Sequence, residues 1–405
     1  MGEISPITAR RAPRRTQIVE ELRRRIVQGE IPPGERLPSR ATLEQDFSAS
    51  SITVQQAFNV LAHEGFVLSQ PNKGTFVAEK PPHLARYGVV LCPDAVGLYG
   101  PFTAVLNREL DAIARARNCR FAFYNNITTR PDTIEYQELL RDIKSHRVAG
   151  LLFRSDVLDP DFLDTPFVTA PGIPRVVLSG DPRDAGKRHN LTLMGCDDCT
   201  FLDRSLDYLL ERGRHRVALL ESWAFVQDEV ADFLLRIGRR KMDTRSQWIH
   251  DELSGKGARK VTELLMSLPP SERPDAILMT HEMLIEPVSA GILASGVKAG
   301  VDVDVVAYSN LPAIGPTLIP LRRLGVDMCD RIRTALELLD RQRRGEAVPP
   351  SVILPLRFED EMPAAAKAGT FSGQNLCVPR GRRSSPAAEC KKGNRKKRKE
   401  VVHVS

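Results

Sequence analysis

The sequence predicts an α/β protein in three parts: a small helical head that ends in a β-hairpin, a large region of parallel sheets in two lobes, and a disordered basic tail. Apolar residues recur at helical spacing in the first 65 residues, and from residue 87 onward short apolar runs alternate with amphipathic helices. Residues 362–405 contain few apolar residues that could be buried. With 405 residues, the chain has enough material for about two or three domains.

The head is predicted to begin with a helix over residues 17–27. Its apolar positions follow a helical spacing and are Ile18, Leu22, Ile26 and Val27. Gly29 stands where this helix is expected to stop, because glycine readily adopts the left-handed conformation that ends helices. The next run, Ile31-Pro32-Pro33-Gly34, forbids continuation of the helix and predicts a turn.

Two further helices follow in the head. Ser39 is expected to cap the second helix, and Ser50 or Ser51 the third. The buried side of the third helix is predicted to consist of Val54, Ala57, Phe58 and Leu61. The residues left to point outward are Ser51, Thr53, Gln55, Gln56 and Asn59. Hydroxyl and amide groups of this kind suit base edges and phosphates, so the third helix is expected to enter a DNA groove.

A β-hairpin closes the head. Two short runs with high β-propensity, Phe66-Val67-Leu68 and Thr75-Phe76-Val77, flank Pro71-Asn72-Lys73-Gly74. The hairpin therefore has a basic tip.

Residues 16–78 resemble the winged helix-turn-helix domain of the GntR regulators. The motifs that carry the resemblance are Gly29 with Ile31-Pro32-Pro33-Gly34, Leu37-Pro38-Ser39, Thr53-Val54, Leu61 to Gly65, and Lys73-Gly74-Thr75-Phe76-Val77. The resemblance implies DNA contacts at Ser39, Arg40, Ser51, Thr53, Gln55, Asn72, Lys73 and Gly74. Gln56, which is expected to point outward, is added as a ninth predicted contact. The family usually has arginines where this chain has Ala41, Ser51 and Gln55, so the operator sequence does not follow from the resemblance.

Charge is spread unevenly along the chain. Residues 1–86 carry a net charge of +3, residues 87–361 carry −5, and residues 362–405 carry +9, within a total of +7. The acidic middle is not expected to bind nucleic acid over a broad surface. The run from Lys391 to Lys399 could attract DNA without sequence preference through counterion release, or it could be a solvated tail.

The compartment and the metal content also follow from composition. No apolar run is long enough to span a membrane, and no secretory signal is recognisable at the N-terminus. Seven cysteines, an odd number, favour a reduced, cytoplasmic protein. Cys196 and Cys199 form a lone pair without a second Cys/His cluster, so no metal is expected, and no motif calls for a cofactor or a catalytic residue.

From residue 87 the pattern predicts strands separated by helices. The strands are predicted at 88–91, 120–124, 148–153, 174–178, 217–220, 275–279 and 303–307. The helices are predicted at 102–116, 136–145, 199–212, 286–295 and 327–342. Continuous apolar strands covered by helices indicate parallel sheets, and the length favours two lobes with a ligand cleft at the carboxyl ends of the strands.

This region is similar to the sensing domain of the LacI regulators, which is itself like periplasmic binding proteins. The matching pieces are Tyr87 to Leu91 with Pro101-Phe102, Val148 to Leu152, Asp197, Leu209 to Ala218, Arg273 to Ile277, Gly296, and Val303 to Tyr308. The resemblance aligns Thr280-His281 and Ser309-Asn310 with an Asn-Asp pair and an Asp-Asp pair that commonly hold sugar hydroxyls. A sugar or related polar metabolite is the first expectation for the ligand; a domain that senses a protein or binds no ligand is the alternative.

Five residues are predicted to line this cleft because each follows a predicted strand. They are Asp94, Tyr99, Trp223, His281 and Asn310. Asn310 offers donors and an acceptor to a hydroxylated ligand, and Trp223 offers a flat apolar face.

The sequence therefore favours a non-enzymatic, ligand-responsive regulator of transcription, a repressor that acts as a homodimer on two-fold operators. Its expected parts are a head at 1–79, a linker at 80–86, a sensing domain at 87–361 and a tail at 362–405. A fused aminotransferase-like enzyme is less favoured, because Lys298 is the only lysine between Lys260 and Lys367 and follows no such motif. A solute-binding protein is opposed by the missing signal peptide and by the DNA-reading head.

Overall fold

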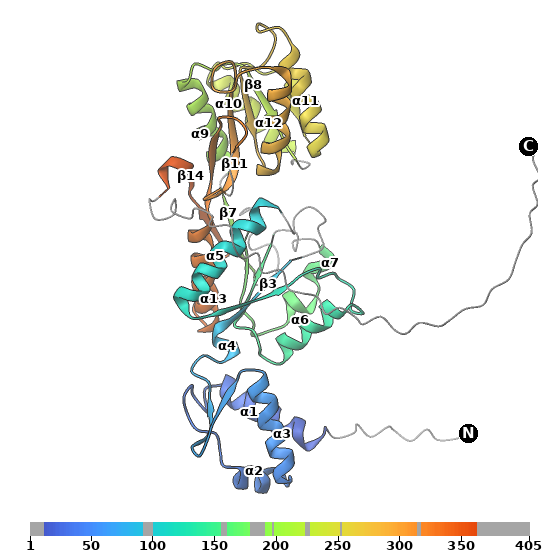
Figure 1. The fold of residues 1–405 in the computed structure, drawn as a ribbon, viewed down its shortest axis with the longest axis vertical. Coiled ribbons are helices and arrows are strands. Elements are labelled where there is room, and N and C mark those ends of the chain that lie inside the picture. The colour runs from blue at the N-terminus through green and yellow to red at the C-terminus, as the bar shows by residue number, and fades with distance from the viewer. Residues whose placement is uncertain are drawn as a thin grey trace, which may run out of the picture.

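The computed structural model describes residues 12–91, 100–154, 160–178, 191–196, 198–222, 227–251, 253–313 and 317–362. Figure 1 shows the helical head at one end of the molecule, a first lobe beside it and a second lobe beyond. Of the predicted disordered tail, 362–405, Met362 is described and buried, and residues 363–405 lie outside the described residues.

The head contains three helices and a hairpin, as predicted. Its elements are α1 (Arg14–Val27), α2 (Arg40–Phe47), α3 (Ser51–His63), β1 (Val67–Gln70) and β2 (Gly74–Val77). The side chain of Ser39 accepts a hydrogen bond from the backbone N–H of Thr42, and that of Ser50 accepts one from Thr53. Ser50, not Ser51, is therefore the cap of α3. The fully buried residues that join these elements include Ile18, Leu22, Leu43, Val54, Ala57, Leu61 and Phe66.

The first lobe is a six-stranded parallel sheet with helices around it. In spatial order its strands are β13 (Ser351–Leu354), β7 (Thr192–Cys196), β6 (Arg175–Val177), β5 (Gly150–Phe153), β3 (Arg86–Val90) and β4 (Arg120–Tyr124). Its helices are α5 (Pro101–Arg117), α6 (Ile134–Lys144), α7 (Pro160–Leu163), α8 (Pro166–Thr169) and α13 (Met328–Arg343). A short helix, α4 (Pro82–Ala85), links the head to β3.

The second lobe repeats this architecture. Its sheet has the order β14 (Leu356–Phe358), β12 (Arg322–Asp327), β11 (Asp304–Leu311), β10 (Ala276–Met279), β8 (Val217–Leu220) and β9 (Ile249–His250), and only β14 runs antiparallel to its neighbour among the described pairings. The helical elements are α9 (Asp198–Glu211), α10 (Gln227–Arg239), α11 (Gly255–Ser267), α12 (Ile285–Ser295), η4 (Ser246–Trp248), η5 (Glu282–Leu284) and η6 (Glu359–Glu361).

The chain crosses between the lobes three times within the described residues: from β7 to α9, from β12 to α13, and from β13 to β14. The fold class and the two-lobed architecture are thus as predicted. All seven predicted strands of this region are present, and β11 extends to Leu311, beyond the predicted end at residue 307. In the part of the chain that the structure describes, no helix is both long enough and apolar enough to cross a membrane.

Candidate nucleic-acid interface and effector region

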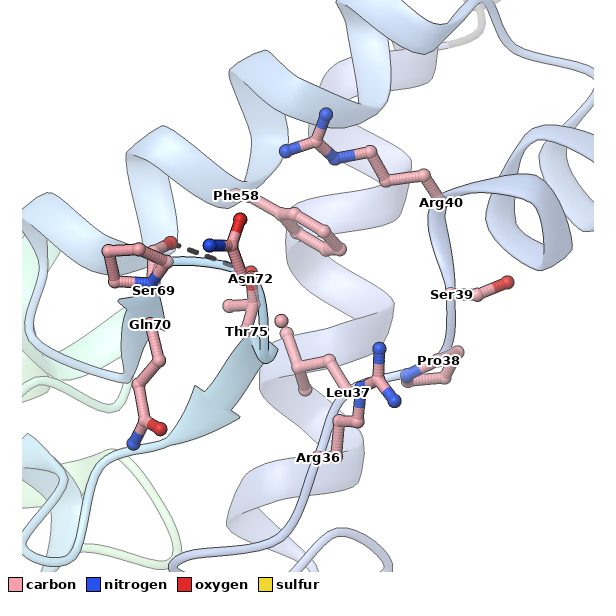
Figure 2. Close-up of a pocket in the computed structure, with 12 residues that line it drawn as sticks. Arg36, Leu37, Pro38, Ser39, Arg40, Phe58, Ser69, Gln70, Asn72 and Thr75 are labelled. Carbon is pink, nitrogen blue, oxygen red and sulfur yellow. Dashed lines mark hydrogen bonds between the residues drawn. The ribbon is translucent and has the colours of Figure 1, made fainter.

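A groove lies between the start of α2, one side of α3 and the hairpin. Its volume is about 460 Å³. The residues that line it are Arg36, Leu37, Pro38, Ser39, Arg40, Phe58, Ser69, Gln70, Pro71, Asn72, Gly74 and Thr75. Figure 2 shows Phe58 between Arg40, which comes from the start of α2, and Asn72, which comes from the hairpin. The groove therefore combines apolar walls with exposed cationic and amide groups.

The segment before α2 is paired with the hairpin, where Arg36 and Phe76 form an antiparallel bridge. The backbone N–H of Leu37 donates to the carbonyl of Thr75 (2.8 Å), and that of Val77 donates to the carbonyl of Glu35 (2.8 Å). Gly74 has a φ of +118°, and a Cβ at this position would lie 2.7 Å from Nε of Arg36. The positive φ favours glycine here, and a larger residue would also have to displace the guanidinium of Arg36. Arg36 was not predicted from the sequence, because its place beside Gly74 depends on this pairing.

The outer side of α3 is polar, as predicted, but two of its groups are already hydrogen-bonded. Nε2 of Gln55 donates to Oδ1 of Asn59 (2.8 Å), and the hydroxyl of Thr53 lies 2.9 Å from that of Ser50. Ser51, Gln56 and Asn59 are exposed. Ile52 was not predicted as a contact, although its side chain is 72% exposed in the first turn of the helix.

Four of the nine predicted DNA contacts line the same groove. They are Ser39, Arg40, Asn72 and Gly74, and Lys73 lies exposed at the turn of the hairpin. Asn72 adopts a left-handed conformation (φ 63°), which asparagine tolerates better than most residues. Ser51, Thr53, Gln55 and Gln56 lie in the first half of α3. Their contact with DNA remains a prediction.

The head is packed against the first lobe through the linker. The rings of Phe66 and His83 are stacked, with centroids 5.9 Å apart and an interplanar angle of 12°. Nζ of Lys80 donates to the carbonyl of Arg117 (2.8 Å) at the end of α5. A guanidinium nitrogen of Arg343, the last residue of α13, donates to the carbonyl of Leu84 (3.3 Å). These contacts fix α4 to both neighbours.

We expect acid to weaken this junction through His83. Burial, followed by the charges of Arg343 and His146, lowers the pKa of His83 from 6.5 to about 4. Between these values the unfolded chain binds a proton that the folded chain does not. Stability is therefore complete above pH 6.5 and falls, by up to roughly 3 kcal/mol, as the pH drops towards 4.

The measurement is the melting temperature of the wild type and of His83→Phe between pH 7 and pH 4.5. Phenylalanine keeps a ring against Phe66 and removes the titrating group, so its melting temperature should fall less with acid. Equal falls in the two proteins would contradict the assignment to His83.

The carboxyl ends of β10 and β11 meet in a buried polar cluster of Glu282, Asn310 and Arg331. The backbone N–H and the side-chain amide of Asn310 donate to the two carboxylate oxygens of Glu282 (3.0 and 2.8 Å). Arg331, near the start of α13, donates to Oδ1 of Asn310 (3.4 Å). The three residues are 7%, 5% and 2% exposed. Burial raises the pKa of the Glu282 carboxyl, although the two bonds from Asn310 oppose this shift.

This cluster changes the expected role of Asn310. Its side-chain amide, predicted to face a hydroxylated ligand, has its oxygen and its nitrogen engaged by Arg331 and Glu282. A close strand approach fixes the position: a Cβ on Gly325 of β12 would lie 1.6 Å from the carbonyl oxygen of Ser309. Glu282 and Arg331 could not be recognised as partners of Asn310 from the sequence, apart from the place of Glu282 after a strand.

The other predicted ligand residues divide into two groups. His281 lies next to Glu282, and its Nδ1 accepts the backbone N–H of Met283 (3.2 Å); burial lowers the pKa of its imidazole. His281 and Asn310 thus lie at the same end of the second sheet. Asp94, Tyr99 and Trp223 lie outside the described residues. Within the described residues, no group of three or more His, Cys, Asp or Glu side chains is placed to hold a metal ion.

The head and the lobes are similar to different known proteins. Residues 14–77 match the family described as "Bacterial regulatory proteins, gntR family". The mannosyl-D-glycerate transport/metabolism system repressor MngR of Escherichia coli (strain K12) is 36% identical over 64 residues, which are 16% of this chain and 27% of the relative. The chain thus matches about a quarter of the length of this repressor, and the similarity concerns a segment as long as the head.

The HTH-type transcriptional repressor PurR of Aliivibrio fischeri (strain MJ11) has a longer match, with 21% identity over 236 residues, which are 56% of this chain and 68% of the relative. A solved structure, a LacI family transcriptional regulator from Lactobacillus casei with bound glucose, has 22% identity and a TM-score of 0.51 over 68% of this chain and 97% of that chain. At this identity the likeness shows the fold: the two lobes have the same architecture as this regulator structure.

Proposed function

We propose that the protein is a ligand-responsive repressor of transcription, on the premise that residues 14–77 form a DNA-binding head of the GntR family. The observation that carries the proposal is the groove between α2, α3 and the hairpin, which is lined by Arg36, Arg40 and Asn72 and lies beside a helix, α3, with an exposed polar side. Cations beside such a helix can fix it on the phosphates while its side chains reach base edges. We place the head at 1–79, the linker at 80–86, the sensing domain at 87–361 and the tail at 362–405.

DNA binding is proposed to require two copies of the chain. A winged helix reads one half of a two-fold operator, so two heads must be held at a fixed spacing, and the two-lobed domain supplies the contact between copies. The similarity to repressors such as MngR supports repression as the outcome. The proposal places the protein in the cytoplasm, because the operator is there.

The effector is proposed to be a sugar or a related polar metabolite that binds between the lobes at the carboxyl ends of the strands. The fold it shares with a regulator structure that holds glucose supports this class. His281 and Asn310, with Asp94, Tyr99 and Trp223, are the proposed lining residues. Asn310 would act through Glu282 and Arg331, which it already bridges.

A second candidate is a regulator whose lobes bind no small molecule. The observation that favours it is the closed polar cluster, because the side-chain amide of Asn310 is already satisfied by protein groups. Thermal-shift measurements with a panel of sugars and polar metabolites distinguish the two: a ligand that raises the melting temperature supports the first. A fused enzyme that uses pyridoxal phosphate is disfavoured, since Lys298 is exposed in the turn after α12.

The test of DNA binding is the salt dependence of operator affinity. Arg40→Ala and Lys73→Ala should each weaken binding to all sequences alike and reduce the slope of log affinity against log salt by about 1, because each removes a cation that can displace a counterion. Lys256→Ala, an exposed lysine at the start of α11, is the matched control and should behave as the wild type. If the slopes of all three variants equal that of the wild type, the proposed groove is not the DNA-binding surface.

A further inference from the structure

One stripe of α3 points to solvent and begins with an apolar residue. Ile52, Gln56 and Asn59 share this side at helical spacing, opposite the buried Val54, Ala57, Phe58 and Leu61. Ile52 is 72% exposed. Among the described residues of the head, Leu68 on β1 is the other large apolar side chain that is exposed, at 57%. The front of the helix therefore presents an isoleucine where a reading helix first meets base edges.

The polar groups around Ile52 are partly committed to the protein. Thr53 is hydrogen-bonded to Ser50 through its hydroxyl and its backbone N–H, so it belongs to the helix cap. Gln55 is bonded to Asn59. Gln56, one turn after Ile52, is exposed. Ile52 and Gln56 are thus adjacent side chains of different chemistry on the outward stripe.

We propose that Ile52 determines part of the operator sequence by packing on the C5-methyl group of a thymine. This inference rests on the proposed function. In the major groove the thymine methyl is the apolar group of the base edges, so it is the natural partner among them for an exposed aliphatic side chain.

The position of Gln56 allows a second prediction about the operator sequence. A glutamine amide can bond the N6 and N7 groups of adenine with two hydrogen bonds. Four residues of helix separate Ile52 and Gln56 by roughly 6 Å along the axis. Successive bases on a strand are about 3.4 Å apart. The operator half-site should therefore contain a thymine and an adenine within about two base-pair steps of each other.

The experiment removes the methyl group from the DNA and the side chain from the protein. Operators are first selected from random duplexes with the full chain, and each thymine of a selected site is then replaced by deoxyuridine, which lacks only the methyl. At one thymine in each half-site, the replacement should weaken wild-type binding about fourfold, which corresponds to the burial of one methyl group. Ile52→Ala should bind more weakly and should no longer distinguish thymine from uracil there.

Ile134→Ala is the matched control, since Ile134 at the start of α6 is 80% exposed and lies outside the head. It should keep the wild-type preference for thymine. If Ile52→Ala binds too weakly for measurement, the comparison is repeated at lower salt, where protein–DNA affinity is higher: loss of the thymine preference supports the inference, and its retention contradicts it.

The outcomes separate this inference from the proposed function. Selection that enriches no sequence would overturn the proposed function and the inference together. A selected operator whose thymines can all be replaced without a change in wild-type affinity would overturn the methyl contact and leave the proposed function standing. A thymine preference that persists in Ile52→Ala would do the same.

Discussion

A chain that lacks residues 1–79 is expected to lose sequence-specific DNA binding while its two lobes remain folded. The buried residues of the head pack among themselves, and the core clusters of the lobes contain no residue of the head. Because specific protein–DNA affinity typically exceeds non-specific affinity by at least about a thousandfold, the expected loss is of that order. Fluorescence anisotropy with a selected operator measures the loss, and a thermal melt followed by circular dichroism reports the fold of the remainder.

A point variant of the full chain provides the control for this deletion. Leu61 is fully buried in the head, so Leu61→Asp should unfold the head by placing a carboxylate in its core. Its DNA binding should fall as in the deletion, and the melting transition of the lobes should persist. Operator preference in the truncated chain would show that the lobes carry the reading surface.

The second large effect is expected from Asn310→Ala. This change leaves the buried Glu282 and Arg331 without the amide that bridges them, and the unfolding free energy should decrease by about 3 kcal/mol. For a region of this size, the melting temperature should fall by roughly 6–12 °C. Any ligand identified by thermal shift should also bind less tightly.

The control for this variant is Asn59→Ala, because Asn59 is an exposed asparagine on α3. Its melting temperature should remain within about 1–2 °C of the wild type. A fall in Asn310→Ala no larger than that of Asn59→Ala would mean that the Glu282–Asn310–Arg331 cluster contributes little to stability.

The head could be predicted almost completely from the sequence because its signals are local. Prolines, glycines and caps define its helix ends, and a few residues separate each signal from the element it ends. Most strands of the lobes were predicted because they are continuous apolar runs. The strands that were not predicted are β7, β9, β12, β13 and β14; β12, for example, begins with two arginines and carries a glycine. Helices α10 and α11 were also missed.

The candidate sites also contain some features that could be predicted from the sequence and others that could not. The placement of His281 and Asn310 at strand ends could be predicted, because strand order alone determines it. Their partners could not: Glu282, Asn310 and Arg331 come from η5, β11 and α13, and only the folded chain brings them together. Ile52 was passed over because an isoleucine in an amphipathic helix is ordinarily counted with the core.

Helix α13 also has a mechanical consequence. Its first turn carries Arg331, which bonds Asn310 of the second lobe, and its last residue, Arg343, bonds the carbonyl of Leu84 in the linker. Its 16 residues form a rod about 24 Å long. Because a helix changes little in length under load, a displacement applied at the Asn310 end arrives at the Leu84 end with nearly the same magnitude. In the proposed dimer, the position of each head would thus depend on the position of α13.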